Sequence, residues 1–151
     1  MSELAVWGME RGGLTSSIPT EIENLSKLIF LDLDYNDLTG SLPSGLFTLG
    51  GLTQLDLNNN RFSGSINDIG AFPEMEFLQL HTNMFTGQIP QSVGTYTKMG
   101  TFTLHQNNIT GAMPDSVCEL VTTDVGVLGS LIADCDKPNP DITCDCCTDC
   151  R

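Results

Sequence analysis

The sequence predicts a right-handed α/β solenoid of five turns, with short parallel strands on a concave face and irregular, 3₁₀ or short helical segments on the convex side. Three observations lead to this fold class. Apolar residues recur in a pattern every 23 or 24 residues, each copy contains a short apolar/polar alternation, and asparagine and glycine recur at fixed places within the copies. Such a period indicates units that must stack, because one unit cannot bury its apolar side chains alone.

The repeat is clearest where Leu28, Leu31 and Leu33 are followed by Asn36 and the segment Leu38-Thr39-Gly40. The equivalents of Asn36 lie at positions 12, 36, 60, 83 and 107, although position 12 is glycine. We expect a solenoid over residues 1–120, with repeats at about 4–27, 28–51, 52–74, 75–98 and 99–120, and a cysteine-rich cap over 121–151.

Each copy predicts the same local structure. The alternation Leu31-Asp32-Leu33 is typical of a short strand with one buried face. The asparagine that follows can both donate and accept hydrogen bonds, so a column of asparagines can satisfy the backbone of neighbouring turns. Residues 44–51 have apolar residues at a helical spacing, which predicts a short helical or 3₁₀ turn on the outer side.

The apolar positions of one copy predict the core: Leu28, Leu31, Leu33, Leu38, Leu42, Leu46 and Leu49. The first copy is degenerate, but we expect Trp7, Met9, Leu14 and Ile18 to point inward. The second copy lacks the usual proline after Ile66 and is one residue short, so we expect an irregularity near 67–71.

The pattern L-x-x-L-x-L-x-x-N-x-L followed by T-G-x-I-P resembles the leucine-rich repeat of the plant-type subclass, over about residues 4–120. The resemblance implies an extracellular recognition protein, such as a receptor ectodomain, an adhesion protein or an inhibitor of a wall-degrading enzyme. Related extracellular proteins have an N-terminal cap with a cysteine pair, and the sequence before Leu4 has none. We therefore expect this chain to be the C-terminal part of a longer protein or the product of a truncated gene model. The uncapped first repeat also favours dimerisation or aggregation through Leu4, Trp7 and Leu14.

The tail has two interpretations. Its six cysteines favour three disulfides in an oxidising compartment, with 15 pairings open. The spacing C-x-C-C-x-x-C also fits a thiolate site for Zn²⁺, which makes a metal-binding tail an alternative function. The cysteines are Cys118, Cys135, Cys144, Cys146, Cys147 and Cys150.

Two N-x-[ST] triplets, at Asn24 and Asn108, are candidate glycosylation sites and support an exported chain. Asn24 falls on the predicted outer segment, where a glycan fits. Asn108 is as readily explained as a polar turn residue.

The outward residues of the predicted strands form four columns and are free for recognition. Exposed aromatic side chains anchor interfaces, and the first half of this face is acidic. Two histidines share one column, but no third metal ligand is evident, so we predict no metal or cofactor here. The candidate binding residues are Phe30, Asp32, Asp34, Tyr35, Gln54, Asp56, Asn58, Phe77, Gln79, His81, Thr103 and His105.

Composition excludes several classes of function. The formal net charge of −13, with 6 Lys and Arg against 19 Asp and Glu, disfavours nucleic-acid binding. No apolar run is long enough to span a membrane, and no catalytic motif is present, so we expect no enzyme. The sequence predicts a non-catalytic module that binds a protein, peptide or glycan outside the cell; a structural component of an extracellular matrix or wall is the alternative.

Overall fold

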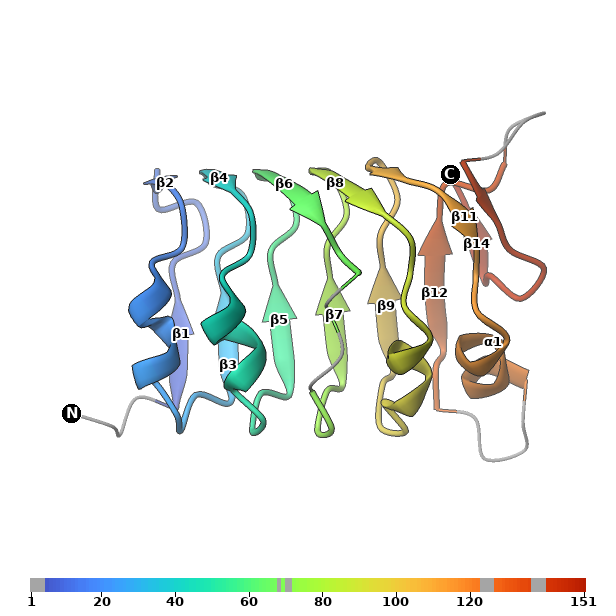
Figure 1. Cartoon of the computed structure of the whole chain (residues 1–151), viewed down its shortest axis with the longest axis horizontal. Helices are drawn as coiled ribbons and strands as arrows, with labels where there is room; N and C mark the ends of the chain where they lie inside the picture. Colours follow the sequence, from blue (N-terminus) through green and yellow to red (C-terminus); the bar gives the residue numbers. More distant parts are fainter. Residues whose placement is uncertain (1–4, 68, 70–71, 123–126, 137–140) are drawn as a thin grey trace.

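The computed structural model describes residues 5–67, 69, 72–122, 127–136 and 141–151. Its main element is a parallel seven-stranded sheet whose strands follow the order of the chain (Figure 1). One strand comes from each of the five expected repeats and two come from the tail. The strands are β1 (Val6–Gly8), β3 (Phe30–Asp32), β5 (Gln54–Asp56), β7 (Phe77–Gln79), β9 (Thr101–Thr103), β12 (Ser130–Ala133) and β14 (Asp149–Cys150).

The tail continues the repeat instead of only covering its end. Leu131 of β12 lies opposite Phe102 of β9, and Ala133 is buried, so the L-x-L alternation returns as Leu131-Ile132-Ala133. The boundary that we expected at residue 120 lies inside the helix α1 (Asp115–Thr122). The cysteine-rich segment therefore supplies a sixth turn of the same sheet.

A second sheet runs along the top of the molecule in Figure 1. Each of its strands follows, along the chain, one strand of the seven-stranded sheet. It contains β2 (Thr15–Ser16), β4 (Asp37–Gly40), β6 (Arg61–Ser65), β8 (Met84–Gly87) and β10 (Asn108–Ile109), and a separate pair joins β11 (Gly111–Ala112) to β13 (Ile142–Thr143).

The asparagine column connects the two sheets. Asn60 donates from Nδ2 to the carbonyl oxygens of Leu33, Leu57 and Asn58 at 2.8, 3.2 and 3.3 Å, and its Oδ1 accepts the N–H of Leu38 at 3.0 Å. One side chain therefore satisfies four backbone groups in two adjacent turns. The same arrangement recurs at Asn36, Asn83 and Asn107.

The core fills the space between the strands and the convex side, as the repeat pattern predicts. Leu28, Leu31, Leu33, Leu38, Leu46 and Leu49 are buried, whereas Leu42 is only half-buried. In the first copy Ile18 is buried, and Trp7 and Leu14 are half-buried. Met9 is 40% exposed, so our expectation that it belongs to the core is wrong. Met9 has the register position of the buried Leu33, but it lies in the first described turn, where a neighbouring turn packs on one side alone.

The convex side consists of short 3₁₀ turns, as expected: η1 (Thr20–Asn24), η2 (Ser44–Thr48) and η3 (Gln91–Thr95). The helix α1 packs beside η3. Parts of the expected irregularity, residues 68, 70 and 71, lie outside the described residues. Nearby, Ile69 and Phe72 are buried, and Asn67 Oδ1 accepts the N–H of Gln88 at 2.9 Å.

The N-terminal end of the solenoid has an apolar hollow of about 160 Å³ lined by Trp7, Leu14, Ile18, Leu33 and Leu38, among others. Two of the residues through which we expect a second copy to pack, Trp7 and Leu14, line this hollow. The third, Leu4, lies outside the described residues. Dimerisation therefore stays a prediction.

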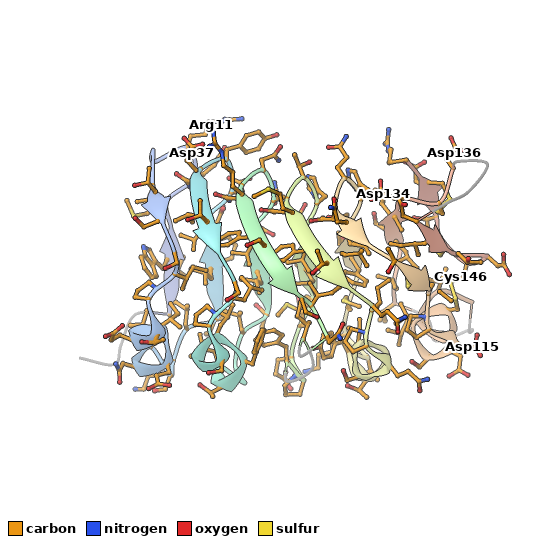
Figure 2. All side chains as sticks on the ribbon, turned by 45° about the horizontal axis from the view of Figure 1, so that its top comes forward. Arg11, Asp37, Asp115, Asp134, Asp136 and Cys146 are labelled. Carbon is orange, nitrogen blue, oxygen red and sulfur yellow. A yellow bond between two sulfur atoms is a disulfide. The ribbon has the colours of Figure 1, made fainter. Side chains whose placement is uncertain are left out.

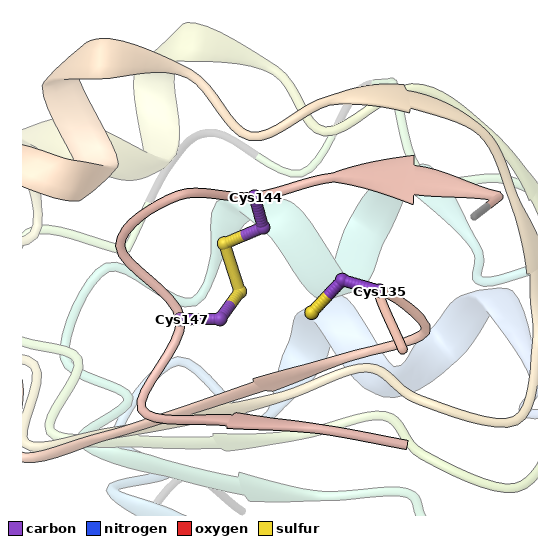
Figure 3. A group of neighbouring side chains, drawn as sticks. All are labelled: Cys135, Cys144 and Cys147. Atoms are coloured by element: carbon purple, nitrogen blue, oxygen red, sulfur yellow. A yellow bond between two sulfur atoms is a disulfide. The ribbon is translucent and has the colours of Figure 1, made fainter. Parts of the chain in front are cut away.

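All six cysteines are paired. The disulfides are Cys118–Cys146, Cys135–Cys150 and Cys144–Cys147, and Figure 3 shows the last of these with Cys135 beside it. Because no thiolate is free in this arrangement, the alternative of a metal-binding tail is wrong for the oxidised protein. Disulfides of this number are typical of proteins in oxidising compartments.

Candidate binding face

The exposed side of the seven-stranded sheet is the candidate site, and we call it the concave face. Its columns follow from the strand register: Phe30, Gln54, Phe77 and Thr101 lie side by side, as do Asp32, Asp56, Gln79 and Thr103. The structure therefore brings the residues of the first two predicted columns together as the repeat spacing requires. Adjacent strands are separated by about 4.8 Å, so side chains in one column lie in contact distance.

Three of the predicted contact residues have little free surface. Asp56 is 6% exposed, Asn58 4% and Thr103 5%, which corrects the expectation that the whole set is open to a ligand. Asp56 contacts Gln54 and Gln79, Asn58 contacts Asp34, and Thr103 contacts His81. These residues instead position the side chains around them.

Asp56 shows how this positioning works. Its Oδ2 accepts a hydrogen bond from Gln54 Nε2 at 2.6 Å, and its Oδ1 accepts one from Gln79 Nε2 at 2.8 Å. Burial raises the pKa of Asp56, and the two amide donors oppose that effect. The buried carboxylate therefore fixes the orientation of two glutamines that lie on the face.

The acidic end of the face contains Glu10, Asp32 and Asp34, which each offer a carboxylate oxygen within 4.8 Å of the others. Burial, together with the negative charges of Asp32, Glu10 and Asp56, raises the pKa of Asp34 to about 6, and a hydrogen bond from Asn58 opposes this. These carboxylates repel one another, so this end attracts a cationic group.

Aromatic side chains lie beside the acidic end and two strands farther along the concave face. Tyr35 is 47% exposed and Phe77 is 41% exposed, whereas Phe30 is half-buried. The guanidinium of Arg11 lies 4.5 Å from the centre of the Tyr35 ring, and Arg11 also pairs with Glu10 at 2.9 Å. Exposed aromatic rings of this kind provide large contact areas at low entropic cost.

The residues that lie three positions after each of the first five strands of the seven-stranded sheet share an unusual backbone conformation, which the sequence did not reveal. The fourth column has φ between 49° and 57° at every repeat, in the left-handed region. This bend redirects the chain from the first sheet to the second. Its members are Arg11, Tyr35, Asn59, Thr82 and Gln106.

Asp134 is a second feature that sequence reasoning missed. It is buried, and its carboxylate accepts the N–H of Gln106 at 3.0 Å and the N–H of Asn107 at 3.3 Å (labelled in Figure 2). In the preceding turns, the N–H group equivalent to that of Gln106 donates to a backbone carbonyl of the next turn; for example, the N–H of Thr82 donates to the carbonyl of His105 at 2.9 Å. At Gln106 the carboxylate of Asp134 replaces that carbonyl, so Asp134 ends this row of hydrogen bonds between turns. The alternation Leu131-Ile132-Ala133, which immediately precedes it, was the available signal.

The two candidate glycosylation positions differ in their setting. Asn24 is exposed at the end of η1 on the convex side, away from the concave face. Asn108 is exposed in β10, which pairs with β8 at the edge of the second sheet. Both side chains are accessible, and their modification stays a prediction.

The comparisons with known proteins agree with this architecture. A family model described as Leucine Rich Repeat matches residues 27–49 and 51–72. The chain is a leucine-rich repeat protein of the plant-type pattern with a disulfide-rich C-terminal segment. A comparison with curated protein sequences finds no match.

Solved structures similar to this chain include plant receptor ectodomains. The peptide hormone receptor RGFR1 in complex with RGF2 is 34% identical, with 70% of this chain and 17% of that chain covered and a TM-score of 0.68. The ectodomain of GASSHO1/SCHENGEN3 from Arabidopsis thaliana, in complex with CASPARIAN STRIP INTEGRITY FACTOR 2, is 29% identical, with coverages of 87% and 18% and a TM-score of 0.71. A chain of the BIR3–SERK2 complex from Arabidopsis thaliana is 28% identical, with coverages of 92% and 71% and a TM-score of 0.71.

The chain thus spans 17 to 18% of the length of the first two of these receptors. Within the described residues, no helix has the length and apolar character needed to cross a bilayer.

Proposed function

We propose that this chain is a non-catalytic recognition module that binds a protein or peptide ligand on its concave face, outside the cell. The observation that supports this most directly is the combination of Tyr35, Phe77 and Phe30 with an acidic cluster on one face of a stacked sheet. Aromatic side chains supply contact area, and fixed carboxylates and amides supply orientation.

The settings of similar proteins support the same proposal. RGFR1 is described as a peptide hormone receptor, and GASSHO1/SCHENGEN3 was solved with a factor bound. Three disulfides support an extracellular location, because thiols stay reduced in the cytosol. Glycans at Asn24 or Asn108 would fit that location.

Selection from a displayed library of random peptides tests the proposal. The oxidised full chain is immobilised, the bare matrix is used for counter-selection, and the affinity of the selected peptides for a Phe30→Ala/Phe77→Ala variant is measured afterwards. Selected peptides should bind the wild type and lose about tenfold or more of their affinity on the variant, since each buried aromatic contact contributes more than about 1 kcal/mol. Circular dichroism confirms that the variant is folded.

Met84→Ala is the matched control. Met84 is 49% exposed and lies on β8 of the second sheet, so its loss should leave the affinity unchanged. If no peptide is enriched over the bare matrix, or if the aromatic variant binds as well as the wild type, the concave-face proposal is wrong. Equal function of the wild type and the variant would instead favour a structural role in a matrix.

A further inference from the structure

The three disulfides of the tail lie against one another at the C-terminal end of the solenoid. The Sγ atoms of Cys135, Cys144 and Cys147 lie within 4.8 Å of one another, and Cys144 Sγ lies 4.0 Å from Cys146 Sγ. The paired cysteines are separated by 3, 15 and 28 residues along the chain. Because the bonds are neighbours in space, the way in which the chain holds each pair of cysteines decides which bond opens first.

The Cys135–Cys150 bond is supported by a sheet. Ala133 of β12 lies opposite Cys150 of β14, and its carbonyl accepts the N–H of Cys135 at 3.1 Å and the N–H of Arg151 at 2.9 Å. These backbone contacts keep the two sulfur atoms next to each other even when the covalent bond between them is open. A pair of thiols held in this way forms its disulfide again readily, because the reaction is intramolecular and well oriented.

The Cys144–Cys147 bond spans a bend that the backbone does not hold (Figure 3). Neither of its cysteines makes a backbone hydrogen bond with another described residue. The Cys118–Cys146 bond is intermediate, because Cys118 lies in α1 whereas Cys146 belongs to the same bend. Once their bond is open, the thiols of Cys144 and Cys147 can move apart, so this disulfide is expected to be the easiest of the three to reduce.

The chain on both sides of this bend is anchored without the help of that bond. Before the bend, the carbonyl of Thr143 in β13 accepts the N–H of Met113 at 2.8 Å. After the bend, Thr148 donates its N–H to the carbonyl of Leu131 at 2.9 Å, and its hydroxyl accepts the N–H of Leu131 at 2.8 Å. Opening the bond therefore releases only the bend between these two anchors.

The bond is also accessible to a thiol in solution. Cys144 and Cys147 are half-buried, and the neighbouring Thr143, Asp145 and Thr148 are exposed. Exchange starts when a thiolate attacks a disulfide sulfur, so the attacking reagent has to reach that atom. The exposed neighbours leave the bend open to such a reagent.

We propose that Cys144–Cys147 is a thiol-exchange site, which accepts two electrons from an external dithiol while the solenoid and the other two disulfides stay intact. One thiolate of the dithiol attacks a sulfur of the bond, forms a mixed disulfide and releases the other cysteine, which takes up a proton. The second thiolate of the reagent then attacks the reagent's own sulfur in the mixed disulfide and releases the second cysteine. One dithiol and one protein disulfide thus become a protein dithiol and the disulfide of the reagent. The substrate class is a protein or small molecule with two neighbouring thiols.

A redox titration of the oxidised full chain tests this site. The protein is equilibrated in mixtures of reduced and oxidised dithiothreitol, treated with N-ethylmaleimide and mapped by tandem mass spectrometry. Cys144 and Cys147 should be alkylated together, at a ratio of reduced to oxidised reagent about tenfold lower than any other cysteine requires. In the ¹H–¹⁵N spectrum of this singly reduced protein, the shifts should be confined to residues near 143–148, and the amides of β7 and β9 should not move.

The double variant Cys144→Ser/Cys147→Ser is the matched control. It should lack the first reduction step, and it should keep the circular dichroism spectrum of the wild type. A variant that does not fold would contradict the independence of the bond from the solenoid, and the titration of the wild type needs no substitution.

The titration has outcomes that overturn the proposal. The proposal is wrong if the three bonds open together, or if Cys118–Cys146 or Cys135–Cys150 opens first. A new pairing of cysteines in the singly reduced protein would also contradict it, because the released thiols would then have attacked the adjacent disulfides. Widespread shifts in the spectrum would show that the bond holds more of the fold than the bend.

Discussion

The imidazole rings of His81 and His105 stack on one another in adjacent turns, with their centres 4.6 Å apart and their planes 6° apart. His81 Nδ1 lies 2.8 Å from the buried hydroxyl of Thr103. Burial and the neighbouring His105 lower the pKa of His81 to about 4, and burial is the main cause that lowers the pKa of His105. Both rings are therefore neutral at neutral pH.

We predict that this pair makes the fold sensitive to acid. A histidine whose pKa is depressed in the folded state contributes stability above its unfolded pKa of 6.5, and that stability is lost as the pH falls towards 4. Urea unfolding at pH 7 and pH 5 should show that the free energy of unfolding falls less between these pH values for His81→Gln than for the wild type. Equal losses in the two proteins would contradict the pKa shift.

Asp34 should act in the opposite direction over the same range. Its pKa is raised from 3.8 to about 6, so as the pH falls the folded state binds a proton at Asp34 before the unfolded state does. The folded state therefore gains stability relative to the unfolded state as the pH falls from 6 towards 4. We therefore expect Asp34→Asn to lose more stability than the wild type between pH 7 and pH 5. The same urea experiment measures this difference, and a smaller loss would refute it.

The asparagine column should be essential for stability. Asn60→Ala removes four hydrogen bonds to backbone groups of two turns, and we expect a loss of about 2–4 kcal/mol in the free energy of unfolding. Asn60→Asp should also destabilise, because a carboxylate cannot donate to the three carbonyls. The control is Asn24→Ala on the convex surface, which should change the free energy by less than about 0.5 kcal/mol. Urea denaturation measures all three, and an Asn60→Ala protein as stable as the control would exclude a structural role for the column.

Two glycines provide a matched pair of substitutions on the convex side. A Cβ at Gly94 would lie 2.6 Å from the backbone carbon of Ser116 in α1, whereas a Cβ at Gly50 meets no atom within 4 Å. Gly94→Ala should therefore separate η3 from α1 and cost about 1–3 kcal/mol. Gly50→Ala should be neutral or slightly stabilising. Thermal unfolding of both variants compares them, and similar melting temperatures would mean that η3 and α1 do not pack this closely.

The disulfides give a direct chemical test. The intact mass of the protein from an oxidising host should show no alkylated cysteine before reduction and six afterwards, as three disulfides require. Replacing Cys118 and Cys146 together with serine should cost about 2–4 kcal/mol, because the bridge constrains the unfolded chain. Alkylation before reduction, with zinc in the sample, would restore the metal-binding alternative for the tail.

The sequence by itself determined the repeated part of the fold. The position of Asn60 and of the leucines around it follows from local periodicity, because each turn contacts mainly its neighbours and a spacing of 23 or 24 residues defines the stack. Strand register, the asparagine column and the identity of residues such as Phe77 on the outer face follow from the same regularity.

Only the tertiary structure decided features in which residues far apart in sequence meet once or not periodically. Which cysteines pair depends on how the tail folds back, and 15 pairings satisfy the same sequence. The burial of Asp56 and Asn58 depends on the size of side chains in neighbouring turns, which alternation alone does not give. Asp134 ends the ladder for a related reason: the edge of a sheet needs an acceptor, and only the folded tail shows which residue provides it.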